Sequence, residues 1–349
     1  MDVINIRSDT QTLPTDAMLQ AMATAPLGDD TYDEDPTVQK LEAMAAERLG
    51  MEAAMLVISG NMANLCALMS HARPGDEVLL DPESHIYFYE SGGLASVAGL
   101  MPMSVPSERG MMQPDDLRAA VRKRNIHHPT PRLFCLENTH NRSGGRVVPL
   151  KLHQELCAAA RENGLAIHLD GARIFNAAIA ADVPVTDYTR DVDSIMFCLS
   201  KGLSCPLGSV LCGRRDFIEQ AQWVRKRLGG GMRQAGVIAA AGIVALEQMV
   251  DRLAEDHEHA RLLARALAEI PGLNVDLGSV ETNMVNVDHS ETGLSTGDFL
   301  ERLKSVGILA GGRPPRQIRF VANRHHTRET MREIARRVEI VVRSALQRG

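Results

Sequence analysis

The sequence Ser-Ile-Met-Phe-Cys-Leu-Ser-Lys-Gly-Leu at residues 194–203 joins a strand-like apolar segment to a single lysine, Lys201, near its carboxyl end. An earlier apolar run, residues 165–169, ends in the same way at an acidic residue, Asp170. A pyridoxal phosphate enzyme needs a lysine that forms a Schiff base with the cofactor aldehyde and a carboxylate that keeps the pyridine nitrogen protonated. A surface lysine and a helix-capping aspartate are each common alone. Together, with a candidate phosphate loop upstream, they favour the cofactor interpretation.

Short apolar runs alternate with helical patterns on both sides of this stretch. The runs at residues 54–58, 77–80 and 133–136 are typical of buried strands, and residues 150–163 follow a helical pattern. Strands separated by helices imply crossover connections and therefore a largely parallel sheet. We predict an α/β fold, with a mostly parallel sheet covered by helices on both faces.

The chain of 349 residues exceeds the usual span of one domain, roughly 100–200 residues, so two domains are expected. Beyond the glycines at 229–231 a long alanine-rich helical region, residues 234–268, leads to shorter strand and helix patterns. These patterns indicate a smaller C-terminal α+β domain. The predicted parts are an N-terminal arm at residues 1–35, a cofactor-binding large domain at 36–250 and a small domain at 251–349.

The composition argues against a nucleic-acid-binding, membrane-spanning or disulfide-rich protein. The net charge of −6 and the scattered basic residues give no reason to expect nucleic acid or an anionic membrane as a partner. Six cysteines lie mostly inside apolar runs without a Cys-x-x-Cys pair, which indicates buried, reduced thiols. Because no targeting pattern opens the chain and no apolar run approaches roughly 20 residues, we expect a cytoplasmic protein. No cluster of side chains has the spacing of a metal site.

A candidate phosphate loop, residues 59–64, follows the strand-like run 55–58 and opens a helical pattern. Backbone amides at the start of a helix bind phosphate, and Gly60 allows close approach. The signal is weak alone, because many strand-to-helix turns look like it. Asn64 also fits an ordinary helix cap.

Three histidines are candidates for contact with the cofactor or for proton transfer. His85 follows the strand-like run 78–80, where its ring would reach the face of a bound cofactor, although an ordinary loop histidine fits equally. His127 and His128 precede a proline-rich entry into the strand at 133–136. Either could move a proton near neutral pH, or both could form a surface pair.

Two arginines are candidates for binding an anionic group. Arg173 follows Asp170 closely and is positioned to reach the cofactor phenolate or a substrate carboxylate. Arg319 lies on a C-terminal strand and could grip a carboxylate through two hydrogen bonds, or face solvent. The segment 137–141 ends a strand at the sheet edge where doubly wound folds bind ligands.

Several motifs occur together and in the order typical of one family, so that the chain resembles the low-specificity L-threonine aldolases. These are pyridoxal phosphate enzymes of the aspartate aminotransferase-like fold, fold type I. The resemblance covers nearly the whole chain. The matching segments are residues 7–10, 28–32, 59–64, 84–85, 137–141, 170–173, 200–203 and 229–234.

The resemblance implies a role for each matching residue at the cofactor. Lys201 would carry the Schiff base, Asp170 would pair with the pyridine nitrogen, and His85 would stack on the ring. Arg173 would also reach the cofactor. The residues implied at the phosphate are Gly60, Asn61 and Ser200, with Arg233 from a neighbouring subunit.

On the substrate side, the resemblance places Ser8, Arg173 and Arg319 at the amino-acid carboxylate and His127 at the hydroxyl. The implied reaction is cleavage of L-threonine or L-allo-threonine to glycine and acetaldehyde. The family's usual assembly implies a homotetramer, a dimer of dimers with sites at the dimer interface, where the N-terminal arm would help to build a site. The chain departs from the family at Asn61, at His128 and at residues 322–323.

Other functions remain open at this point. Lys201 and Asp170 would equally serve β-elimination, transamination, decarboxylation or racemisation, because a fold does not decide its chemistry. A nucleotide-binding Rossmann protein is less favoured, since no Gly-x-Gly-x-x-Gly turn follows the early strands. A scaffold that has lost its cofactor is the third alternative, and the retained Lys201 and Asp170 argue against it.

Overall fold

The computed structural model describes residues 2–123 and 125–347, which form two compact units. The larger unit comprises Leu13–Ser143 and Val147–Val250, and the smaller one comprises the described parts of 1–12 and 251–349 together with Gly144–Arg146. The segment 1–35 is therefore divided between the two units. Its contribution to a site stays a prediction.

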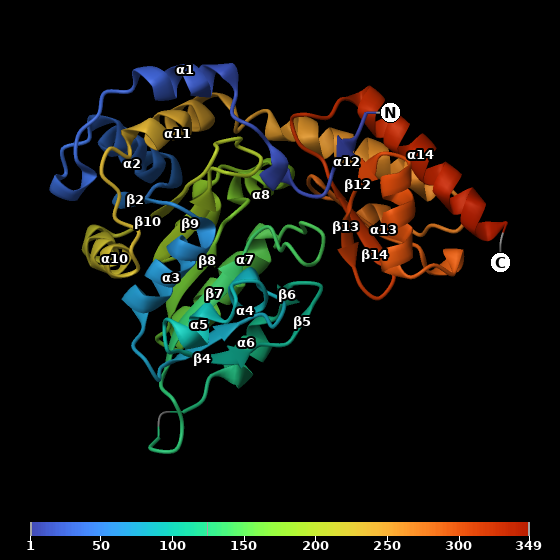
Figure 1. The fold of residues 1–349 in the computed structure, drawn as a ribbon. Helices are drawn as coiled ribbons and strands as arrows, with labels where there is room; N and C mark the ends of the chain where they lie inside the picture. Colours follow the sequence, from blue (N-terminus) through green and yellow to red (C-terminus); the bar gives the residue numbers. More distant parts are fainter. Residues whose placement is uncertain (1, 124, 348–349) are drawn as a thin grey trace. The chain divides into compact units, whose positions relative to one another are not determined.

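A sheet of seven strands forms the centre of the larger unit, counted over the described residues (Figure 1). Every neighbouring pair in it is parallel except the two pairs made by β10, which runs against both of its neighbours. The predicted mostly parallel α/β sheet is confirmed. In spatial order the strands are β2 (Ala53–Val57), β10 (Ser209–Gly213), β9 (Ser194–Cys198), β8 (Ala166–Asp170), β7 (Pro131–Glu137), β3 (Glu77–Leu80) and β4 (Met101–Ser104).

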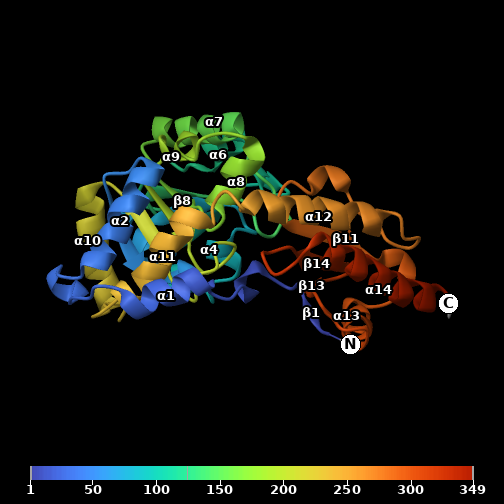
Figure 2. The same cartoon turned by 90° about the horizontal axis from the view of Figure 1, so that it is seen from above.

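Helices cover both faces of this sheet. On one face α3 (Gly60–His71) and α10 (Arg215–Arg227) pack on β2, β9 and β10 in a common apolar cluster. On the other face lie α2 (Pro36–Leu49) and α7 (Leu150–Glu162), the latter with α6 (Pro114–Ala120) and α9 (Thr186–Thr189) beside it (Figure 2). Because both faces are covered, the central strand β9 is buried at all five positions, which explains its continuous apolar sequence.

The remaining elements of the larger unit are short or peripheral. A small hairpin joins β5 to β6, and α1 packs on α11. These elements are α1 (Asp16–Thr24), α4 (His85–Phe88), α5 (Gly93–Ser96), β5 (Ser107–Glu108), β6 (Met111–Met112), α8 (Ile174–Ala181) and α11 (Gly236–Gln248).

The smaller unit is an α+β layer with its own apolar core. Its antiparallel sheet has the order β11 (Met284–Asp288), β14 (Gln317–Val321), β13 (Gly311–Arg313), and β1 (Ile4–Asn5) pairs in parallel with β12 (Ile308–Leu309). The helices α12 (Leu253–Ala268), α13 (Thr296–Ser305) and α14 (Arg328–Leu346) bury their apolar faces against it. This is the α+β character predicted for the C-terminal region.

The continuous helical region predicted at 234–268 is wrong, because the structure divides it into α11 and α12. The break falls at the boundary between the two units, Val250 to Asp251. Each helix packs in the core of its own unit. The residues that stabilise α11 are therefore different from those that stabilise α12.

Over the described residues, the structure contains no helix with both the length and the apolar character that crossing a bilayer requires. The six cysteines are all buried free thiols.

Buried histidines make the stability of this fold sensitive to acid. Burial lowers the pKa of His71, His153, His257 and His326 to about 4 and that of His168 to about 3. Below the ordinary pKa of 6.5 the unfolded chain binds protons that the native chain excludes, so stability falls as the pH falls. Burial raises the pKa of Glu42 to about 7 and that of Asp256 to about 6, which has the opposite effect. The raised pKa values of Asp30, Glu90, His85 and His140 act in the same opposing direction through smaller shifts.

We therefore expect the free energy of unfolding to fall by at least about 3 kcal/mol between pH 7 and pH 4.5. A pKa lowered by roughly two units at a single histidine already accounts for a change of this size. Urea denaturation of the apoprotein at a series of pH values measures it. His153→Gln, on α7 and remote from the sheet edge, should lower the slope. A stability that stays constant over this range would contradict the prediction.

Candidate active site

The strands β2, β3, β7, β8 and β9 all run in one direction, so their carboxyl ends meet at one edge of the sheet. Gly60 follows β2 and His85 follows β3. Asp170 is the last residue of β8, and Lys201 comes soon after β9. The structure thus brings four predicted site residues to the same edge, where α/β folds bind their ligands.

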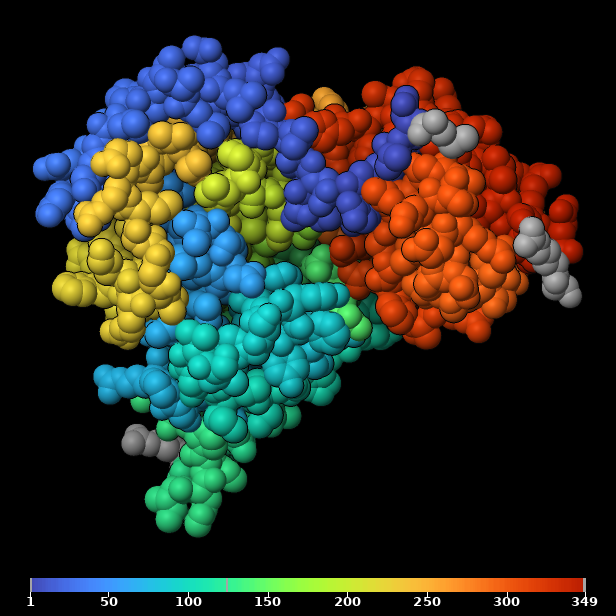
Figure 3. Space-filling view, viewed as in Figure 1, coloured from blue at the N-terminus to red at the C-terminus, as the bar shows by residue number. Residues whose placement is uncertain are grey.

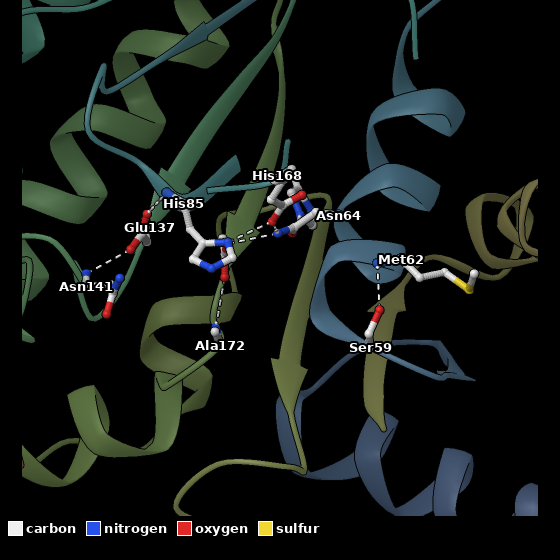
Figure 4. Close-up of polar contacts among 10 residues, drawn as sticks. Ser59, Met62, Asn64, His85, Glu137, Asn141, His168 and Ala172 are labelled. Atoms are coloured by element: carbon white, nitrogen blue, oxygen red, sulfur yellow. Dashed lines mark hydrogen bonds and ion pairs between the residues drawn. The ribbon is translucent and has the colours of Figure 1, made fainter. Parts of the chain in front are cut away.

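The loop after β2 leads directly into the first turn of α3. Ser59 caps this helix, its hydroxyl accepting from the amide of Met62 at 3.2 Å (Figure 4). A Cβ atom at Gly60 would lie 3.1 Å from the side chains of both Cys198 and Met196, so glycine lets the helix start close to β9. Asn61 is exposed beside it. Ahead of the capped Met62 amide, the amides of Gly60 and Asn61 are left without an acceptor by the helix geometry, which suits them to an anion.

Asp170 is 1% exposed and already holds two hydrogen bonds. Its Oδ1 accepts from the amide of Ala172 at 3.1 Å, and its Oδ2 accepts from the Asn64 side-chain amide at 2.9 Å. Donors of this kind stabilise a buried carboxylate in its charged form. A carboxylate has about four lone-pair sites, so capacity remains for a cationic ligand. Arg173 is also buried and directly precedes α8.

His85 is held at both its backbone and its ring. Its amide donates to Glu137 Oε2 at 2.5 Å, and its Nδ1 lies 2.9 Å from Glu90 Oε1. Burial alone would lower the pKa of His85, but the hydrogen bond to Glu90 and the charges of Asp170 and Glu90 outweigh it and raise that pKa, against the opposing charge of Lys201. His85 therefore lies within electrostatic reach of both Asp170 and Lys201.

Glu90 and Asn64 complete a buried polar group behind His85, which Figure 4 shows in part. The Asn64 amide nitrogen lies 2.7 Å from Glu90 Oε1, and Asn64 Oδ1 lies 3.0 Å from His168 Nε2. The interpretation of Asn64 as a helix cap is wrong, because Ser59 takes that position. Atoms of His85, Glu90 and Asp170 lie within 4.8 Å of one another, a grouping that metal sites also show, and each of the three takes part in the hydrogen bonds given above.

Sequence reasoning missed Glu90 and His168 as parts of the site, and it placed Asn64 in the phosphate loop without its contacts to Asp170 and Glu90. His168 carried a signal, since it is the one polar side chain inside the apolar run 165–169. Glu90 carried none, because an acidic residue in a turn-rich segment is ordinarily solvated.

His127 and His128 lie elsewhere. Both are exposed in the segment that precedes β7, and this segment projects from the larger unit (Figure 3). It lies at the amino end of β7, whereas Glu137 lies at the carboxyl end, about 20 Å away for a strand of this length. Within one chain the structure does not bring His127 to the edge that holds Asp170. Its predicted role stays a prediction.

The other predicted residues lie in defined local settings. Ser200 and Lys201 are half-buried after β9. Arg233 forms an ion pair of 3.1 Å with Asp29, within the larger unit, and its predicted reach to a phosphate is untested.

Ser8 and Arg319 belong to the smaller unit. The Ser8 hydroxyl accepts from the amide of Thr10 at 3.2 Å, and its carbonyl accepts from the Asn323 side chain at 3.5 Å. Arg319 lies in the central strand β14, opposite Asn286 of β11. The departure from the resembling family at residues 322–323 therefore lies next to Ser8, and not at a remote position.

Comparisons with known proteins identify the family of the chain. The family model described as beta-eliminating lyase matches residues 5–290. A low-specificity L-threonine aldolase from Escherichia coli K12 is 41% identical over 335 residues, which cover 95% of this chain and 97% of that protein. Low-specificity L-threonine aldolase 1 from Arabidopsis thaliana is 43% identical over 331 residues, covering 93% of this chain and 92% of that protein.

Among solved structures, a threonine aldolase from Leishmania major superposes with a TM-score of 0.83, covering 98% of this chain and 99% of that one at 20% identity. That likeness shows the fold, which is fold type I of the pyridoxal phosphate enzymes. Together with the sequence matches over nearly the whole length, these findings show that the chain belongs to the beta-eliminating lyase family, among the low-specificity L-threonine aldolases.

Proposed function

We propose that this chain cleaves L-threonine and L-allo-threonine to glycine and acetaldehyde, with pyridoxal phosphate bound at the carboxyl edge of the sheet. The observation that carries the proposal is the placement of a buried, doubly hydrogen-bonded Asp170 at the same edge as Lys201 and the start of α3. The identity to threonine aldolases supports the choice of substrate.

The residues at this edge fit the three chemical parts of pyridoxal phosphate. Asp170 suits the pyridine nitrogen, Lys201 the aldehyde, and the first turn of α3 with Gly60, Asn61 and Ser200 the phosphate. The His85 ring would stack on the cofactor. When bound, the cofactor accepts the electron pair released as the bond between Cα and Cβ of the substrate breaks.

Each side chain then has a definite task. Asp170 holds a proton on the ring nitrogen by its negative charge, and Lys201 moves a proton at the substrate Cα. Arg173, with Ser8 and Arg319, would bind the substrate carboxylate and so orient the Cα–Cβ bond for cleavage. Holding a reacting geometry of this kind can be worth roughly 7–11 kcal/mol of barrier.

The base that takes the proton from the β-hydroxyl is assigned to His127. Since His127 lies at the opposite end of β7 from Glu137, it can act only in a site to which another copy of the chain contributes. This agrees with the proposed homotetramer with sites at a dimer interface. The same assembly would bring Arg233 to a neighbouring site.

His127→Ala is expected to lower cleavage by about 10²–10³-fold, within the range typical of general-base catalysis, while the cofactor stays bound. The measurement is acetaldehyde release by coupled reduction at saturating L-allo-threonine. His128→Ala, one residue along the same exposed loop, is the matched control and should retain activity. Unchanged turnover in His127→Ala would remove it from the mechanism and favour His85 or a water.

The proposed sharing of His127 between copies has its own test. Inactive His127→Ala and Lys201→Ala chains, dissociated and reassembled together, should recover part of the activity, because some sites then combine an intact His127 with an intact Lys201. No recovery in assemblies that demonstrably contain both chains would contradict the sharing.

β-Elimination on the same site is the second candidate, favoured by the family to which the chain belongs. A product assay separates the two reactions. Glycine with acetaldehyde supports cleavage, whereas a keto acid with ammonia from serine or threonine supports elimination.

The proposed compartment is the cytoplasm. The six buried free thiols support it, because they fit a reducing environment.

A further inference from the structure

A single amide, that of Asn64, lies between two buried carboxylates. Its nitrogen is 2.7 Å from Glu90 Oε1 and 2.9 Å from Asp170 Oδ2, so each of its two hydrogens has a carboxylate acceptor. Glu90 is 5% exposed, Asp170 is 1% exposed, and Asn64 is 1% exposed. Two like charges this close would force one carboxyl to take up a proton unless donors compensate them.

The orientation of the Asn64 amide is determined by its surroundings. If the amide group were turned by 180°, its oxygen would face both carboxylates, which have no hydrogen to donate when they are charged. In the observed orientation Oδ1 faces His168 Nε2 at 3.0 Å, so this nitrogen carries the hydrogen. Because His168 is buried and neutral, its Nδ1 accepts, and the donor is the Ser194 hydroxyl at 2.8 Å.

The chain of hydrogen bonds continues by one more residue, to His71. The Ser194 hydroxyl has given its hydrogen to His168, so His71 Nε2, 2.7 Å away, donates to Ser194. His71 stacks on Phe217 with ring centroids 4.4 Å apart. The hydrogen bonds from His71 through Ser194 and His168 to Asn64 therefore all point one way, toward the carboxylates. We call these four residues the Asn64 network.

We propose that Asn64 is a positioning residue that keeps Asp170 charged for the ring nitrogen and Glu90 charged for His85, and that the rest of the Asn64 network holds its amide in place. The proposal rests on the proposed function for the part that concerns the cofactor. The charged groups that act on His85 are Glu90, Asp170 and Lys201. A change in the charge of Glu90 therefore changes the pKa of the His85 imidazole.

Asn64→Leu removes both donors at similar volume and tests the first half of the proposal in the apoprotein. Without the amide, Glu90 takes up a proton more readily and His85 loses its charged partner. The pH midpoint of the His85 imidazole titration, followed by NMR, should therefore fall by about one unit. Glu90→Gln should lower it by a similar amount, and Ser194→Ala should lower it less.

The second half is tested with cofactor labelled with nitrogen-15 in the ring. The wild-type chain should hold the ring nitrogen protonated to a higher pH than Asn64→Leu, by about one unit or more, as read from the nitrogen chemical shift. Ser70→Ala is the matched control for Ser194→Ala. It also removes a hydroxyl buried near His71, but one that makes no hydrogen bond within the described part of the chain, and it should change neither titration.

Titrations in Asn64→Leu that stay within about 0.3 unit of wild type would overturn the proposal. If Asn64→Leu does not fold, Ser194→Ala carries the test with the same criterion against Ser70→Ala. A wild-type chain that binds no pyridoxal phosphate would remove the proposed function instead. In that case the His85 titration in the apoprotein still decides whether Asn64 sets the charge of Glu90.

Discussion

Lys201→Ala is expected to remove the absorbance band of covalently bound pyridoxal phosphate and to lower threonine cleavage by at least about 10⁴-fold. Two proposed contributions of Lys201 would be lost together: the covalent attachment of the cofactor after β9 and the transfer of a proton at the substrate Cα. Proton transfer alone is typically worth about 10²–10⁴-fold. Asp170 and His85, at the same edge, can take over neither role, because their own hydrogen bonds hold them in place.

The measurement is an absorbance spectrum of the purified variant with added cofactor, followed by acetaldehyde release. Lys151→Ala is the matched control, since this lysine on α7 is exposed and should change neither the spectrum nor the rate. A Lys201→Ala chain that keeps the band would exclude this lysine as the point of attachment. It would also remove the basis for placing the cofactor at this edge.

Asp170 and Lys201, the two residues that identified the site, could be predicted because a continuous apolar run marks the end of a buried strand in the sequence. Asp170 and Lys201 each follow a continuous apolar run, and in a parallel sheet such runs end at a common edge. The structure places both there, with His85 and Gly60. Local pattern was sufficient, because the position of a residue at a strand end is itself a local property.

Contacts between distant segments were beyond sequence reasoning. Asn64 matched a helix cap because asparagine is common there, and only the fold shows that Ser59 caps α3 while Asn64 faces two carboxylates. His127 shows the converse limit. The prolines placed it before a strand whose carboxyl end, at 137–141, was already predicted at the binding edge, and the parallel pairing of β7 with β8 confirms that direction. The sequence of one chain does not show whether a second copy brings His127 to such an edge.

The electrostatic effects of burial at this site could not be predicted from the sequence either, because they also depend on contacts between distant segments. A carboxylate such as Glu90 is ordinarily solvated in a turn, but the fold buries it beside His85 and Asp170. Burial raises the pKa of Glu90, and the hydrogen bond to Glu90 helps to raise the pKa of His85 against its own burial. Sequence names the residue types, whereas these pKa shifts arise from distances set by strands far apart in the chain.

Asp170→Asn is expected to lower cleavage by at least about 10³-fold, equivalent to about 4 kcal/mol of barrier, while the fold is retained. The substitution keeps the shape but creates a conflict among donors. With its oxygen toward the Ala172 amide, the new amide group faces the Asn64 amide, donor against donor. With the opposite orientation it faces the Ala172 amide instead. In either case the negative charge that would pair with the ring nitrogen is gone.

The measurement pairs the cleavage rate at saturating cofactor with the protonation of the nitrogen-15 labelled ring. Asp81→Asn is the matched control, because it also neutralises a carboxyl buried at the end of a strand, β3, but one engaged by Ser107 and His140. This control should lower the stability of the fold but leave the protonation of the ring nitrogen unchanged. If Asp170→Asn keeps its rate within tenfold while the ring nitrogen is shown to be neutral, ring protonation is not what drives the cleavage. The electron pair would then have to be stabilised mainly through the aldehyde side of the cofactor, and Lys201 and Arg173 would become the residues on which the reaction depends.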